Sequence, residues 1–133
     1  MNVSPLNQQQ KGCSELMFDY SMLTNLIGRS LTMLVDRPLG SSHPNYPDII
    51  YPINYGYIPG LLAADGEEQD VYLLGVYEPV ETYTGVIIAI LIRTDDVEDK
   101  LVMAPAGKSI TDSEILEQTY FQEQYFKTTL IRL

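Results

Sequence analysis

The sequence predicts an α+β domain that is mainly β, a small closed β-barrel with a C-terminal helix packed on it. Three strand-like runs support the barrel: VYLLGVYEPV at 71–80, GVIIAILIRT at 85–94 and KLVMAP at 100–105. They are too uniformly apolar for a sheet with one solvated face, so we expect both faces to be covered. The helix is predicted by a capping box, Thr111 with Glu114, at the start of SEILEQTYFQEQYFK.

Two further segments precede these runs. In SLTMLVDRPLG, at 30–40, apolar residues alternate with polar ones, which predicts a half-buried strand ended by proline and glycine. The next stretch, 40–60, holds four prolines and three glycines together with several tyrosines, which excludes a helix and predicts an aromatic-rich loop packed on the barrel.

The chain of 133 residues has the length of one ordinary domain. Residues 1–25 begin in a polar segment with little to bury, so we expect a poorly ordered or short-helical N-terminal extension, followed by a single barrel domain at 26–133. With one cysteine, Cys13, no internal disulfide can form, which indicates a reducing compartment. The sequence has no apolar run long enough to span a membrane and no apolar signal core, so we expect a cytoplasmic protein.

The charge balance limits the partners. A formal net charge of −10 with eight lysines and arginines in total argues against a nucleic-acid or anionic-membrane partner, because phosphate backbones are bound through clustered basic residues. An acidic chain is instead suited to a site that collects cations.

Acidic residues concentrate in two clusters, DGEEQD at 65–70 and TDDVEDK at 94–100. Both lie at the ends of predicted strands that we expect to be neighbours in the barrel, so their carboxylates could meet at one end of it. Hard divalent cations prefer such oxygen ligands. Taken singly, each cluster is also typical of a solvated turn, and neither has the spacing of an EF-hand.

Basic residues accompany these clusters. Arg37 ends the first predicted strand, Lys100 follows the second cluster, and Lys127 ends the helix, where a lysine also commonly complements the helix dipole. We expect the single histidine, His43, at the surface, because it has no second histidine or cysteine for a transition-metal site and no triad partners.

The order of five segments is more specific than any one of them: VDRPLG, YPINYGYIPG, DGEEQDVYLLG, DDVEDKLV and FQEQYFK. Together they resemble the family I soluble inorganic pyrophosphatases, over about Leu26 to Arg132. That family has a small barrel related to the OB-fold, with a Mg²⁺-lined cavity. The resemblance therefore implies hydrolysis of inorganic diphosphate to two phosphates, by attack of a metal-activated water, with Mg²⁺ or Mn²⁺ as cofactor.

The resemblance also implies residue roles. The expected metal ligands are Asp65, Asp70, Asp96 and Asp99, with Asp95 and Glu98 as alternatives in the second cluster. The expected catalytic residues are Glu67 and Asp70, with Glu67 at the position of the general base. The groups expected to bind diphosphate and phosphate are Arg37, Tyr51, Tyr55, Lys100, Tyr125 and Lys127; one extra residue, Phe126, separates the last two.

Two departures from the family pattern raise an alternative. The family has an aspartate at the middle position of the signature that matches DGEEQD, and this chain has Glu67 there, whose extra methylene could displace the carboxylate. The family's usual N-terminal strand pair, which carries a lysine and two acidic residues, is shortened or absent. Arg29 is a candidate for the lysine, but Leu31 has no acidic group. The alternative is therefore a pyrophosphatase-like module that binds Mg²⁺ and diphosphate or phosphate without efficient turnover. A third reading is a structural domain with acidic loops. The short domain also favours a homo-oligomer.

Overall fold

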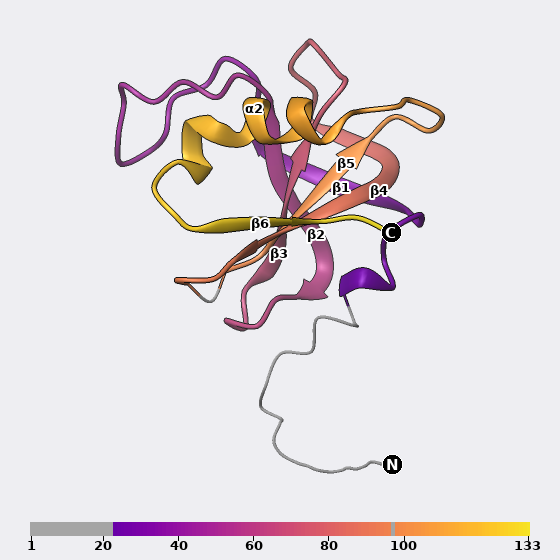
Figure 1. The fold of residues 1–133 in the computed structure, drawn as a ribbon. Helices are drawn as coiled ribbons and strands as arrows, with labels where there is room; N and C mark the ends of the chain where they lie inside the picture. Colours follow the sequence, from indigo (N-terminus) through magenta and orange to yellow (C-terminus); the bar gives the residue numbers. More distant parts are fainter. Residues whose placement is uncertain (1–22, 97) are drawn as a thin grey trace.

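The computed structural model describes residues 23–96 and 98–133, which contain six strands and a C-terminal helix. Figure 1 labels these elements along the chain. They are β1 (Ser30–Arg37), β2 (Asn54–Leu62), β3 (Glu68–Leu73), β4 (Thr82–Arg93), β5 (Lys100–Ala104), α2 (Asp112–Glu123) and β6 (Thr128–Ile131).

The strands close into a barrel in the order β1-β2-β3-β5-β4, and β4 pairs back with β1. The closing pair is antiparallel, from Ser30 opposite Val86 to Leu34 opposite Thr82. Strands β3 and β5 are parallel, with Val71 opposite Leu101. The start of β3 therefore lies beside the start of β5, so the ends of the two acidic clusters meet at one end of the barrel. The predicted mainly β, closed-barrel fold is confirmed.

Both faces of the central strands are buried, which explains their uniformly apolar sequences. On β3, Val71 and Leu73 belong to one core cluster while Tyr72 faces a second one. Leu101 and Val102 of β5 divide in the same way. Side chains alternate across a strand, so two separate layers cover the sheet. The second cluster includes Ile110, Ile115 and the partly buried Phe121, so it lies under α2, which crosses over the barrel in Figure 1.

Helix α2 begins with the predicted capping box: the Glu114 N–H donates to Thr111 Oγ1, and the Thr111 N–H donates to Glu114 Oε1. The buried residues Ile115, Thr119 and Glu123 follow an i, i+4 spacing and face the barrel. On the side of Leu116 and Tyr120 the helix is exposed, so within a single chain only one face of α2 is covered.

Strand β2 occupies the second part of the segment 40–60 that we expect to be a loop and continues to Leu62. Gly56 makes it possible, because a Cβ atom at this position would lie 1.8 Å from the carbonyl oxygen of Leu34 on β1. Pro59 and Gly60 fall in an irregular stretch of the β2–β3 pairing, where a missing ladder hydrogen bond is tolerated. Strand β6 was not predicted either; it extends the sheet along the end of β4.

Most of the expected N-terminal extension, residues 1–22, lies outside the described residues. Leu23 is buried and belongs to the same core cluster as Met33 of β1. Among residues 23–96 and 98–133, no helix is long and apolar enough to cross a membrane.

Candidate active site

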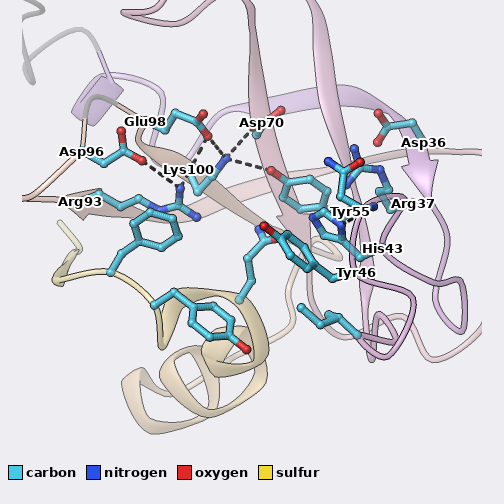
Figure 2. Close-up of a pocket in the computed structure, with 15 residues that line it drawn as sticks. Asp36, Arg37, His43, Tyr46, Tyr55, Asp70, Arg93, Asp96, Glu98 and Lys100 are labelled. Atoms are coloured by element: carbon cyan, nitrogen blue, oxygen red, sulfur yellow. Dashed lines mark hydrogen bonds and ion pairs between the residues drawn. The ribbon is translucent and has the colours of Figure 1, made fainter.

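A cavity of about 760 Å³ opens between the barrel, the loop that follows β1 and the C-terminal end of α2. Figure 2 shows charged groups from several strands pointing into it, with the rings of His43 and Tyr46 at its side. The residues that line it are Asp36, Arg37, His43, Asn45, Tyr46, Ile49, Tyr55, Asp70, Arg93, Asp96, Glu98, Lys100, Gln122, Tyr125 and Phe126.

Lys100, the first residue of β5, is the central cation of this cavity. Its side chain is only 2% exposed, and Nζ donates to Asp70 Oδ2 at 2.6 Å, to Glu98 Oε1 at 2.7 Å and to the Tyr55 hydroxyl at 2.9 Å. These contacts use all three donors of the ammonium group. Burial acts to lower the pKa of Lys100, but the neighbouring Tyr55 and Asp70 prevail and raise it, so the side chain remains cationic.

Arg93, the last residue of β4, is a second buried cation. Its Nε and one Nη donate to Glu123 at 3.1 and 2.7 Å, and the guanidinium lies 3.7 Å from the centre of the Phe126 ring. The other nitrogen, Nη1, is 3.6 Å from both Asp96 and Glu98.

Glu98 therefore contacts both cations, and five groups form one row of alternating charge: Asp70, Lys100, Glu98, Arg93 and Asp96. Figure 2 marks these ion pairs. Because β3 and β5 are parallel neighbours and β5 pairs with β4, the acidic residues and the two cations are brought to the same end of the barrel.

Arg37 and Asp36 line the other side of the cavity. Consecutive residues of a regular strand point to opposite faces, but the β1–β2 register shifts between Val35 and Arg37. This bulge allows both charged side chains to face the cavity. Arg37 Nη1 donates to the buried Tyr51 hydroxyl at 2.8 Å, and that hydroxyl donates to Gln122 of α2. Burial raises the pKa of Tyr51, so it stays a neutral phenol.

Six of the residues expected from the sequence line this cavity: Arg37, Tyr55, Asp70, Asp96, Lys100 and Tyr125. Tyr51 supports it from behind through Arg37, and its ring packs 5.7 Å from that of Tyr55.

The other expected residues lie outside the lining. Asp65 and Glu67 are exposed in the β2–β3 turn, where Asp65 Oδ1 accepts the Glu67 N–H at 2.9 Å and so shapes the turn. Asp99 is buried, and its Oδ1 accepts the backbone N–H of Arg93. Lys127 is exposed, and its N–H donates to Asp95 Oδ1.

Several residues of the cavity lining were not predicted from the sequence. The Asp36 side chain faces the cavity because of the bulge in β1, which the alternation of side chains along a strand does not predict. His43 was expected at the surface; it is half-buried, and its Nδ1 accepts the Asn45 N–H at 3.0 Å. Arg93 lies at the end of an apolar run and directly before an acidic cluster, and this position of a charged residue is a sequence signal for a site residue.

The donor set fits a hard divalent cation in its chemistry, because Asp70, Asp96 and Glu98 present carboxylate oxygens to one cavity. Among residues 23–96 and 98–133, no three acidic, histidine or cysteine side chains lie close enough together to hold an ion. The groups between these carboxylates are the Lys100 ammonium and the Arg93 guanidinium, so a cation would exchange with protein cations already bound there.

Sequence comparison relates this chain to a known protein family. The family model for inorganic pyrophosphatase matches residues 31–129. The chain is 33% identical over 81 residues to the inorganic pyrophosphatase of Campylobacter jejuni, covering 57% of this chain and 43% of the relative. It is 38% identical over 69 residues to that of Aeropyrum pernix, covering 47% and 38%. The matched part thus spans about two fifths of the length of these curated relatives.

Solved structures show the same fold. The inorganic pyrophosphatase of Ehrlichia chaffeensis superposes with a TM-score of 0.62 at 16% identity, covering 80% of this chain and 87% of that one. The enzyme from Neisseria gonorrhoeae gives 0.59 at 22% identity, with 74% of each chain covered. With the family model matching from β1 to the end of the barrel, the chain belongs to the inorganic pyrophosphatase family.

Proposed function

We propose that this chain hydrolyses inorganic diphosphate to two phosphate ions and that the reaction depends on a divalent cation, Mg²⁺ or Mn²⁺. The observation that carries the proposal is the charged cavity, in which Arg37 and Lys100 face the carboxylates of Asp70, Asp96 and Glu98. A dense polyanion needs both kinds of group: cationic side chains to bind its oxygens, and carboxylates to hold the cations that accompany it.

The proposed division of labour follows the geometry. Asp70, Asp96 and Glu98 would hold the cation, which lowers the pKa of water and offsets the charge of the phosphoanhydride. Lys100, aligned by Tyr55, and Arg37, aligned by Tyr51, would bind phosphate oxygens. Tyr125 is exposed at the cavity wall and would contact the outer phosphate. On the resemblance alone, we also propose Asp65 and Asp99 as metal ligands and Glu67 as the general base. Substitution of each residue tests its role.

The test is the release of phosphate from diphosphate in excess Mg²⁺, repeated with Mn²⁺. We expect release that is abolished by a chelator and restored by the added cation. Absence of release with both metals would refute hydrolysis.

A second candidate is a module that binds the cation and diphosphate without efficient turnover. It is favoured by Glu67, which stands at the position of the general base but lies exposed in the turn, outside the cavity lining. Calorimetry separates the two: a pure binder gives a stable titration with diphosphate, whereas an enzyme gives continuing heat and free phosphate.

A cytoplasmic location and a homo-oligomeric state are also proposals. The exposed Leu116 and Tyr120 on α2 support the second, since a partner subunit would cover them. Analytical ultracentrifugation of the full chain tests it.

A further inference from the structure

Lys127, the lysine expected to bind phosphate near the end of the helix, is not among the residues that line the cavity. The helix ends at Glu123, and the segment after it places Tyr125 and Phe126 on the cavity wall. Lys127, which follows them, points its backbone N–H to Asp95 and receives the Thr94 N–H on its carbonyl oxygen. Phe126 therefore lines the wall next to Tyr125, where the resemblance implies a lysine.

A different cation stands against that wall. The Arg93 guanidinium is stacked on the Phe126 ring at 3.7 Å and is held edge-on by Glu123. Its side chain is 4% exposed, yet it belongs to the cavity lining. Glu123 is itself held by the Tyr72 hydroxyl at 2.6 Å and the Thr128 hydroxyl at 2.8 Å. The guanidinium is therefore fixed in position before any ligand binds, which lowers the entropic cost of using it.

Only Nη1 of Arg93 is directed away from Glu123. Its two acidic neighbours, Asp96 and Glu98, are each 3.6 Å away, beyond the usual length of an N–H···O hydrogen bond. These are contacts between charges, without the short hydrogen bonds that hold the other two nitrogens. An anion that enters together with a divalent cation can exchange partners with this row: the cation takes the carboxylates, and the anion takes Nη1.

We propose that Arg93 is a substrate-binding residue that hydrogen-bonds a phosphate of the diphosphate through Nη1, in the role that the resemblance assigns to Lys127. This inference rests on the proposed function. Phe126 and Glu123 are positioning residues, because they act on the substrate only through Arg93. A guanidinium at this place is permanently charged and offers directed donors, whereas a lysine at the helix end could be placed less accurately.

The test measures binding without turnover, by titrating the full chain in Mg²⁺ with methylenediphosphonate, a diphosphate analogue that is not hydrolysed. The main variant combines Arg93→Met with Glu123→Gln, so that no buried charge is left unpaired. Arg93→Lys is the second variant. Lys127→Met tests the rival assignment, and Lys108→Met, at a remote exposed lysine on Tyr77, is the control for removing a positive charge. Circular dichroism first establishes that each variant is folded at the titration temperature.

We expect both Arg93 variants to raise the Kd for methylenediphosphonate by about tenfold or more, the loss typical of a hydrogen bond to a charged group. Binding of Mg²⁺ alone should not weaken in the double variant, because the competing guanidinium beside Asp96 and Glu98 is gone. Structural damage would weaken the binding of both ligands. Weaker binding of the analogue with undiminished binding of Mg²⁺ therefore identifies a role in substrate binding. Lys127→Met should behave like Lys108→Met.

An unchanged Kd in the Arg93 variants, a loss at Lys127 instead, or weaker binding of both ligands would overturn the inference. So would a wild-type chain that binds no methylenediphosphonate. If the wild type binds the analogue through Arg93 but releases no phosphate from diphosphate, the inference stands and hydrolysis is refuted.

Discussion

Glu123 supports the cavity from behind, and its replacement by glutamine should destabilise the fold strongly. The carboxylate is 6% exposed and accepts four hydrogen bonds, two from Arg93, one from Tyr72 and one from Thr128. A glutamine keeps one acceptor oxygen and turns an NH₂ group toward donors. Breaking a buried ion pair on one side costs about 3–5 kcal/mol. Since glutamine retains part of the hydrogen bonding, we expect about 2–4 kcal/mol less free energy of unfolding at pH 7.

The pH dependence gives this prediction a second, independent readout. Burial acts to raise the pKa of Glu123, but hydrogen bonds from Arg93 and Tyr72 outweigh it and lower the pKa below its ordinary 4.5. A carboxyl with a lowered folded-state pKa contributes stability that is present above 4.5 and is lost as the pH falls through the folded-state value. The difference between wild type and Glu123→Gln should therefore be full at pH 7 and should shrink below pH 4.5.

Urea unfolding followed by tyrosine fluorescence measures both effects. The matched control is Glu114→Gln on the same helix, because Glu114 is exposed and a glutamine preserves the capping box. We expect this control to unfold almost as the wild type does. A Glu123→Gln variant within about 0.5 kcal/mol of wild type at pH 7, the range of ordinary surface changes, would refute the reasoning.

Three further predictions concern one residue of the barrel and two residues of the first acidic cluster. Gly56→Ala should prevent β1 and β2 from pairing, because the added Cβ would lie 1.8 Å from the Leu34 carbonyl oxygen; we expect an insoluble or unfolded chain by circular dichroism, and a normal melting curve would contradict this. Asp70→Asn should lower phosphate release at least about a hundredfold. Asparagine keeps an acceptor oxygen and Lys100 keeps Glu98 and Tyr55, so the free energy of unfolding should change by about 1 kcal/mol, and full activity would show that the cation is held elsewhere. Glu67→Asp should preserve or raise kcat if position 67 supplies the base, and complete loss of turnover with unchanged folding would exclude that role.

The barrel could be predicted because its central strands are buried on both faces, and such strands read as continuous apolar runs. Strand β2 could not, since the proline and glycine content that excludes a helix does not distinguish a loop from a strand with a close backbone contact at Gly56. Helix α2 was predictable at its start from the capping box but not at its end. The residues after Glu123 continue with aromatic and polar side chains and carry no glycine or proline to mark where the helix stops.

The site was predictable where a residue type and its place in the chain are sufficient, as for Arg37 at the end of β1 or Lys100 at the start of β5. It was not predictable where the backbone redirects side chains. The bulge brings Asp36 into the cavity, and the turn after α2 substitutes Phe126 for Lys127 on its wall. Both depend on backbone geometry of one or two residues, which apolar periodicity does not record.

The clustered acidic residues of this chain raise the question of what holds them together before any ligand binds. Four of the five members of the charge row, Asp70, Lys100, Glu98 and Asp96, come from the two acidic clusters, and Arg93 directly precedes the second one. The two cations of the row offset part of the charge of its three carboxylates, and Arg93 is paired with Glu123 as well. Carboxylates that do not join the row satisfy backbone groups instead: Asp65 accepts the Glu67 N–H, and Glu68 accepts the Gly60 N–H. Because Lys100 and Arg93 already occupy these carboxylates, a metal cation must replace them there. Removing the charge of Lys100 or Arg93 should therefore strengthen the binding of Mg²⁺ and weaken the binding of diphosphate.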